Sequence, residues 1–288
     1  MIATPMTAKD LVAQIKNLPP VSHAALKLVS LLDQPAVSNE DVVQVLKYDN
    51  VLTAKLLRAC NSPYYGFEEP VSSVEQAVLI LGHQQILHIV LSIAFGGAMS
   101  TPLPGYAAEA KELWAHSLTT AMAADRIARH TTTMDLEPAV TFTAGLLHDI
   151  GKLALNHALT AEAQAEIRRL INDRNLSRSE AEAEVIGTDH GEVGACLLES
   201  WRLPAEIVEA VRNHHRPVVD PLPKLSTPTH VANCLAHLIG STVGWEGFAV
   251  RTDARATEAL GITPEKLETL MMSAHDAAAQ VQHFMNLT

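Results

Sequence analysis

The segment Ala144-Gly-Leu-Leu-His-Asp-Ile-Gly-Lys152 decides how the fold of this chain is interpreted. His148 and Asp149 are adjacent near a helix end, so their side chains lie about 100° apart around the helix axis. Two donors in this arrangement can flank one metal ion, and the Asp149 carboxylate can bridge to a second. The segment predicts a metal-binding centre at the end of a helix.

The composition of the whole chain favours helices. Of its 288 residues, 48% are hydrophobic and only 4% aromatic, and the sequence contains 41 alanines and 36 leucines. Small and straight-chain residues lose the least entropy in a helix. Because no alternating strand pattern longer than a few residues occurs, we expect an all-α fold. The length is enough for roughly two domains of about 150 residues each.

Two clusters of helix-breaking residues divide the chain. Thr101-Pro-Leu-Pro-Gly105 is expected to join two packed helical subdomains, and residues 216–228, with four prolines, are expected to form a loop. We therefore predict an N-terminal helical subdomain at 1–104, a helical bundle with the candidate metal site at 105–240, and a C-terminal helical extension at 241–288.

Local signals mark several helix starts in the N-terminal part. Ser38 with Asp41 three residues later is typical of a helix N-cap, and Asp49 or Asn50 can cap the next helix. Gly82 is expected to break or pivot the apolar helix that follows.

Charge and targeting signals narrow the function classes. The chain carries 21 basic and 32 acidic residues, for a net charge of −11, and has no basic stripe, which argues against direct nucleic-acid binding. The N-terminus does not resemble a signal peptide, and the most apolar run, 86–99, is shorter than the ~20 residues of a membrane span. Cys60, Cys196 and Cys234 are widely spaced, which is typical of a reducing compartment. We expect a soluble cytoplasmic protein without a membrane partner.

Further histidines and carboxylates recur at helix ends on both sides of the central segment. Glu112 and His116 lie one turn apart on a helix expected from Lys111 to His130. Side chains from separate helix ends can converge in a bundle core, and two metal ions ~4 Å apart can activate water and neutralise a phosphate. The candidate ligands are His116, His148, Asp149, His190, His214 and His215, with Glu112 as an additional candidate and Lys152 as a candidate phosphate contact.

Each of the weaker candidates has a structural alternative. Glu112 and His116 could be an ordinary helix pair, His215 could cap the last carbonyls of its helix, and Lys152 could favour a helix C-terminus. The remaining nine histidines fit no ligand pattern and are taken as surface or satisfied core residues; they are His23, His83, His88, His130, His157, His230, His237, His275 and His283.

The order of these residues resembles the HD superfamily of metal-dependent phosphohydrolases. The resemblance implies that His116, His148 and Asp149 are first-site ligands, and that the second-site ligands are His190, His214 and His215. The family's last ligand is an Asp, and Asn233 occupies that position here. An amide oxygen is a weaker ligand for hard or borderline cations than a carboxylate. Glu112 could compensate, as an acid does in some three-metal members.

The N-terminal half resembles the HDOD domain, the HD-related output domain of bacterial signalling proteins. The resemblance rests on Leu18-Pro-Pro20, on 49–66 and on 71–82, and it extends over roughly residues 10–240. It implies a cytoplasmic regulator, often tied to two-component or cyclic-nucleotide circuits, with no established catalysis for most members. Relatives that hydrolyse cyclic di-GMP carry Gly-Tyr-Pro shortly after the paired histidines, and here Arg216-Pro-Val-Val follows instead.

Two function hypotheses remain open. The first is a signalling module without catalysis that contacts proteins such as a sensor kinase or another regulator. Its pocket either retains one or two divalent metals (Fe, Mn or Zn) or is empty and binds a small phosphorylated ligand. The second is a metal-dependent phosphohydrolase or phosphodiesterase acting on a nucleotide or cyclic dinucleotide.

Overall fold

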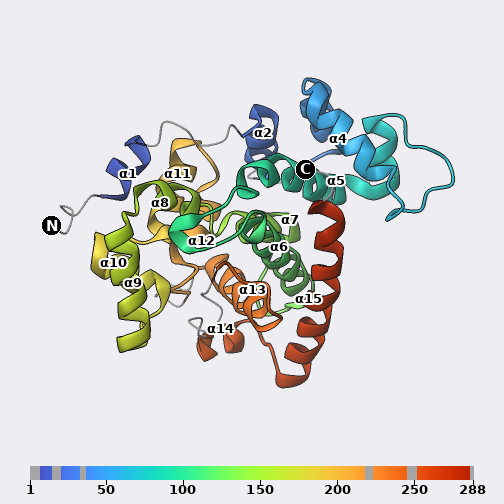
Figure 1. The fold of residues 1–288 in the computed structure, drawn as a ribbon. Helices are drawn as coiled ribbons and strands as arrows, with labels where there is room; N and C mark the ends of the chain where they lie inside the picture. Colours follow the sequence, from blue (N-terminus) through green and yellow to red (C-terminus); the bar gives the residue numbers. More distant parts are fainter. Residues whose placement is uncertain (1–6, 15–20, 33–36, 218–222, 245–251, 286–288) are drawn as a thin grey trace.

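The computed structural model describes residues 7–14, 21–32, 37–217, 223–244 and 252–285. Every regular element within these ranges is a helix, and the one β-type contact described is an isolated antiparallel bridge between Leu103 and Ala108. The all-α prediction is therefore confirmed (Figure 1).

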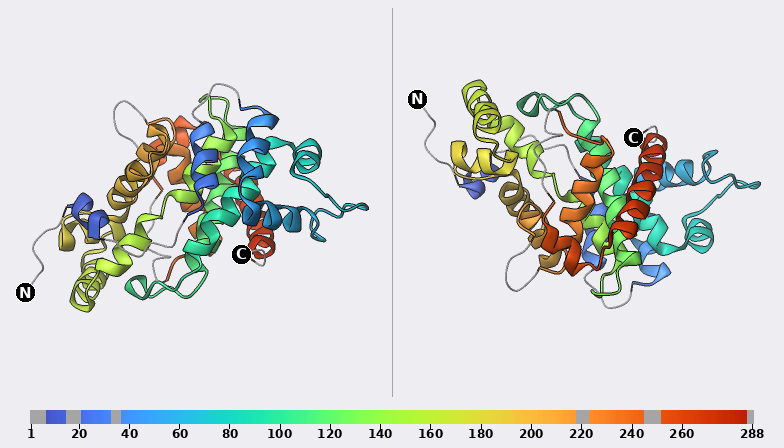
Figure 2. Two further views of the ribbon diagram at one scale, coloured as in Figure 1. Left: turned by 90° about the horizontal axis from the view of Figure 1, so that it is seen from above. Right: turned by 90° about the horizontal axis from the view of Figure 1, so that it is seen from below.

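Among the described residues, five helices form the N-terminal part. The local caps predicted for two of them are present: Ser38 and Asp41 form a reciprocal capping box, and the Asp49 side chain accepts a hydrogen bond from the Leu52 amide. These helices are α1 (Ala8–Gln14), α2 (His23–Leu31), α3 (Asn39–Lys47), α4 (Asn50–Cys60) and α5 (Val74–Met99). The segment between α4 and α5 projects away from the other helices in all views (Figures 1 and 2).

Helix α5 is bent and mostly internal. Gly82 has φ 77° and ψ 157°, a conformation that strains any residue with a Cβ atom, so the predicted pivot is confirmed. By length and composition α5 could cross a membrane, but 56% of its most apolar 18-residue stretch is buried inside the protein. Burial of this kind is typical of a core helix.

Of the remaining helices, α7, α13 and α15 contact α6 most extensively, whereas α9 and α10 lie away from it at the left of Figure 1. The loop expected at 216–228 ends a few residues earlier, because Pro228 lies in the first turn of α13, and residues 218–222 of that loop are outside the described residues. Proline is tolerated there, since the first-turn amides have no partner within the helix. The elements are η1 (Pro104–Tyr106), α6 (Glu112–His130), α7 (Pro138–Leu147), α8 (Gly151–Ala158), α9 (Ala161–Arg174), α10 (Arg178–Ile186), α11 (His190–Ser200), α12 (Ala205–Asn213), α13 (Ser226–Leu238), α14 (Ala254–Ala259) and α15 (Pro264–Met285).

Apolar side chains join the N-terminal helices to the bundle. One cluster of buried residues runs continuously from α1 to α12 and includes Phe95, Trp114 and Phe142, each at most 2% exposed. A second cluster holds α6 against α13, α14 and α15. Burial of each large side chain contributes about 1.5–3 kcal/mol to folding. The domain boundaries at 104 and 240 stay predictions.

Gly151 sets the distance between α8 and α11. A Cβ atom on this residue would overlap the carbonyl oxygen of His190 and would lie 2.6 Å from the amide nitrogen of Gly194. Only glycine therefore allows this approach. The contact places the turn that carries His148 and Asp149 directly against the start of α11.

Candidate metal centre

The His-Asp doublet lies in the turn between α7 and α8. His148 is the C-cap residue of α7, and its Nδ1 is 2.8 Å from the Gly145 carbonyl oxygen one turn back. Ile150, which follows Asp149, is fully buried and anchors the turn in the core. The local sequence thus holds the side chains of His148 and Asp149 in the interior of the bundle.

Backbone carbonyls orient three of the histidine rings. The Nδ1 atoms of His116, His148 and His214 are 2.7–2.8 Å from the carbonyl oxygens of Ser241, Gly145 and Val211. A carbonyl only accepts hydrogen bonds, so each Nδ1 must be the protonated donor. In the neutral ring the lone pair is then on Nε2, the arrangement that outer hydrogen bonds impose on metal-binding histidines.

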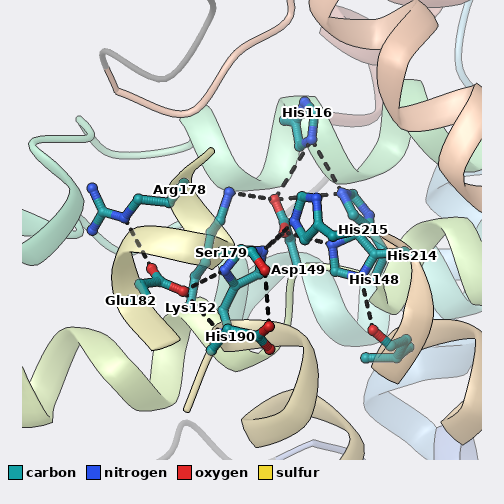
Figure 3. Close-up of polar contacts among 12 residues, drawn as sticks. His116, His148, Asp149, Lys152, Arg178, Ser179, Glu182, His190, His214 and His215 are labelled. Atoms are coloured by element: carbon teal, nitrogen blue, oxygen red, sulfur yellow. Dashed lines mark hydrogen bonds and ion pairs between the residues drawn. The ribbon is translucent and has the colours of Figure 1, made fainter. Parts of the chain in front are cut away.

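The Nε2 atoms of His116 and His148 face each other beside Asp149 (Figure 3). They are 3.2 Å apart, and they lie 3.6 and 3.4 Å from Asp149 Oδ2. These three donors form a first group whose ligand atoms lie close enough together to hold one metal ion.

A second group forms on the other oxygen of the same carboxylate. The Nε2 atoms of His190 and His214 are 3.3 and 3.7 Å from Asp149 Oδ1. His215 joins them, with its Nε2 2.7 Å from that of His190. These four residues could also hold a metal ion, so Asp149 is shared by two potential subsites.

The centre is closed to solvent over most of its surface. His116, His148, Asp149, His190 and His214 are at most 1% exposed. Burial, and then neighbouring histidines, hold the pKa values of His116, His214 and His215 well below the usual range. These three rings are therefore neutral and can act as ligands.

Asp149 stays ionised in this interior. Burial alone would raise the pKa of its carboxyl, but His148 and Lys152 hold it well below the usual range. Lys152 Nζ is 2.8 Å from Asp149 Oδ2 and 5.7 Å from the centre of the Tyr106 ring. Lys152 belongs to the first turn of α8, so the alternative that it favours a helix C-terminus was wrong.

Glu182 is part of the centre although the sequence did not single it out. Its carboxylate accepts hydrogen bonds from Nδ1 and the backbone amide of His190, from Arg178 Nε and from the Tyr106 hydroxyl, at 2.7–3.0 Å. Burial lowers the pKa of His190, but the Glu182 carboxylate outweighs it and the pKa rises to about 10. In the sequence, Arg178 and Glu182 resemble an ordinary helix ion pair, so only the fold reveals this role.

The further candidates for metal or phosphate binding, Glu112, Asn233 and Lys152, lie in different surroundings. Glu112 belongs to neither group, and its Oε2 accepts a hydrogen bond of 2.8 Å from the Gly244 amide. Asn233 is buried, and within the described residues its Oδ1 has no hydrogen-bond partner. The phosphate contact of Lys152 stays a prediction.

His237 lies beside the first group, although it was counted among the histidines without a function. Its ring centre is 4.7 Å from that of His116, and its buried Nδ1 has no hydrogen-bond partner in the part of the chain that is described. The spacing of Asn233 and His237, one helical turn apart on α13, is the signal that could have pointed to it.

This donor set fits divalent metal ions. Five imidazoles and one shared carboxylate converge, and His214 Nε2, buried at the centre, has no hydrogen-bond partner among the described residues. A buried polar atom left without a partner costs about 1–3 kcal/mol, which a bound cation would remove. Imidazole and carboxylate together suit Fe, Mn or Zn.

An all-helical fold with a buried His-Asp doublet, completed by histidines from separate helices, defines an HD-type protein. The chain belongs to the HDOD domain family, which matches residues 18–217.

Three similar proteins illustrate the relationship. An HDOD domain protein of unknown function from Geobacter sulfurreducens has 25% sequence identity and a TM-score of 0.70, and the match covers 97% of this chain and 95% of that one. A Marinobacter aquaeolei VT8 protein, proposed to act in signal transduction, has 21% identity and a TM-score of 0.76. The match covers 99% of this chain and 62% of that one. An uncharacterized protein of Treponema pallidum (strain Nichols) is 24% identical over 212 residues, 74% of this chain but only 40% of that protein's length.

Proposed function

We propose that this HDOD-family chain is a bacterial cytoplasmic signalling protein that acts through contacts with other proteins. Its His/Asp centre binds one or two divalent metal ions and does not hydrolyse a substrate. The observation that carries this proposal is the closed centre, in which the Lys152 ammonium group contacts the one carboxylate that both subsites share.

Hydrolysis needs more room than this centre offers. A catalytic metal keeps an open coordination position, and a two-metal phosphohydrolase must also admit the phosphate group. Here five of the six candidate ligands are buried, and Lys152 already contacts one oxygen of Asp149. The neutral Asn233 at the family's Asp position, and the absence of Gly-Tyr-Pro after His215, favour the same conclusion.

A metal in this centre would link helices that are distant in sequence. The six candidate ligands come from α6, from the turn between α7 and α8, from α11 and from the end of α12. When bound, the ion would stabilise one packing of these helices, because binding to the folded state alone shifts the folding equilibrium. A sensor kinase or another regulator would then recognise that packing of the helices. The signal that controls this chain would itself arrive from a separate protein.

The alternative is a metal-dependent phosphohydrolase or phosphodiesterase acting on a nucleotide or cyclic dinucleotide. The sharing of Asp149 between the two ligand groups favours this alternative. Two ions in such a site would supply Lewis-acid activation of water and of a phosphate ester.

Metal content and turnover separate the two proposals. The full chain, purified without chelator and loaded with Fe, Mn or Zn, is assayed for bound metal, melting temperature and hydrolysis of a panel of phosphodiesters and nucleotides. We expect bound metal and a raised melting temperature without turnover above the blank. Turnover that disappears in His148→Ala and Asp149→Ala but persists in His130→Ala, an exposed control on α6, would instead establish the hydrolase.

A further inference from the structure

A hollow of about 400 Å³ adjoins the second group of ligands. One wall is the segment that follows α12, with His215 and Arg216, and the other is the segment at the start of α14, with Thr252, Asp253 and Arg255. Of the six candidate metal ligands, His215 is the one that lines it, so the hollow touches the centre at a single side chain.

Buried His230 ties the two walls together. Its Nδ1 donates to the carbonyl oxygen of His214 at 2.8 Å, and its Nε2 accepts from the Asp253 amide at 3.1 Å. His230 is 4% exposed; its contact with His214 is buried, and its contact with Asp253 is partly buried at the edge of the hollow. The hollow is therefore a built feature rather than an accidental gap between two loops.

His215 differs from the other four histidines of the centre. His116, His148, His190 and His214 each have Nδ1 bonded to a carbonyl or carboxylate inside the protein. The hydrogen bond described for His215 involves Nε2, which faces His190. His215 lines the hollow, and among the described residues no hydrogen bond to its Nδ1 is present, so we take this edge of the ring as the one that an outside acceptor can bind.

Two arginines, Arg216 and Arg255, line the hollow together with His215. Arg216 is 66% exposed and only loosely paired, since its guanidinium is 3.6 Å from an Asp189 oxygen that already accepts a hydrogen bond from Ser179. Arg255 is 68% exposed and is paired with Asp253 at 2.7 Å. Arg216 can therefore turn towards an anion at little cost, whereas Arg255 adds positive potential at the rim but remains tied to Asp253.

We propose that this hollow binds a small phosphate-bearing ligand, which accepts a hydrogen bond from His215 Nδ1–H and pairs with Arg216. The inference deepens the proposed function and rests on it for one consequence, the coupling between ligand and metal. An acceptor on Nδ1 orients a histidine and makes Nε2 a better metal ligand, as Glu182 does for His190. Ligand and metal then strengthen each other's binding by the same factor, about tenfold.

The test is calorimetric titration of the full chain with inorganic phosphate at constant ionic strength, in metal-free and Mn²⁺-loaded protein. We expect phosphate to bind both forms, about tenfold more tightly when Mn²⁺ is present. Arg216→Gln should weaken binding about tenfold in both forms, because a charge-assisted contact is lost. Arg174→Gln, a similarly exposed arginine paired with Glu184, should change nothing.

The outcomes distinguish this inference from the proposed function. Metal binding without any phosphate binding overturns the inference and leaves the proposed function intact. The same holds if phosphate binds only when Mn²⁺ is present and Arg216→Gln does not change its affinity. Phosphate binding that depends on Arg216 in a protein that binds no metal supports the hollow as a phosphate site and overturns only the metal centre. Because Arg216 is on the surface, its replacement should leave the melting temperature unchanged, which is measured in parallel.

Discussion

The ammonium group of Lys152 lies 2.8 Å from Oδ2 of Asp149, the carboxylate to which both groups of histidines turn. Both side chains are almost completely buried. A fixed positive charge therefore neutralises the carboxylate when no metal is bound, and it repels a cation that approaches the same oxygen.

Replacing Lys152 by Met should have opposite effects on the metal-free and metal-bound protein. Without metal, the buried carboxylate loses its ammonium partner and keeps only the neighbouring histidines, so the free energy of unfolding should fall by about 3 kcal/mol. With metal, removal of the repelling charge should raise affinity about tenfold. Denaturation and metal titration measure the two effects, and Lys47→Met, which removes an exposed ion pair with Glu75, is the control. Weaker metal binding in Lys152→Met would show that the lysine supports the ion.

Glu182 should control the second subsite through His190. Glu182→Gln removes the charge behind the ring but keeps an acceptor, so affinity for one metal equivalent should fall about 10–100-fold. The other equivalent, held by His116 and His148, should change little. Glu184→Gln, an exposed residue on the same helix, provides the control. Equal weakening of both equivalents would mean that Glu182 only supports the fold.

Asn233→Asp should convert the first subsite into a better site for hard cations. A carboxylate binds Mn²⁺ more strongly than an amide oxygen, and we expect about a tenfold gain in affinity. Without metal, the same change buries an additional negative charge and should lower the melting temperature. Asn172→Asp, on the exposed side of α9, should do neither. An unchanged Mn²⁺ affinity in a folded Asn233→Asp protein would place Asn233 outside the site.

Acid should destabilise the protein through His88, away from the metal centre. This ring stacks on Phe142, and burial lowers its pKa to about 4 although Asp125 opposes the shift. In the unfolded chain His88 therefore takes up a proton near pH 6.5, whereas in the folded chain it does so only near pH 4. Stability is complete above pH 6.5 and falls as the pH drops towards 4, by about 3 kcal/mol from this residue.

Denaturation curves at several pH values check the contribution of His88. His88→Phe keeps a ring against Phe142 and leaves Asp125 paired with Arg129, so its stability should fall less steeply over this pH range. Identical slopes for wild type and His88→Phe would show that His88 does not contribute to the acid sensitivity.

Features that depend on neighbouring residues could be predicted from the sequence. The caps at Ser38 and Asp49 and the pivot at Gly82 are local, because each needs only a few residues and a backbone conformation.

Features that depend on tertiary contacts could not be predicted. Glu182 reaches His190 only because α10 and α11 fold back on each other, and His237 meets His116 only because α13 packs on α6. The position of Lys152 was misjudged because the turn after Leu147 separates two helices where the sequence suggested one helix end. The pairing of Glu112 with the Gly244 amide is likewise invisible without the fold.

The most direct test of the account is the amount of metal that the centre retains. Wild type and Asp149→Asn, a change that keeps the shape of the shared ligand, are loaded with Fe, Mn or Zn, desalted and analysed for metal. The account predicts about one to two ions per wild-type chain and less than about 0.2 per Asp149→Asn chain. Fewer than about 0.2 ions per wild-type chain with every metal, or equal retention by the variant, would contradict it.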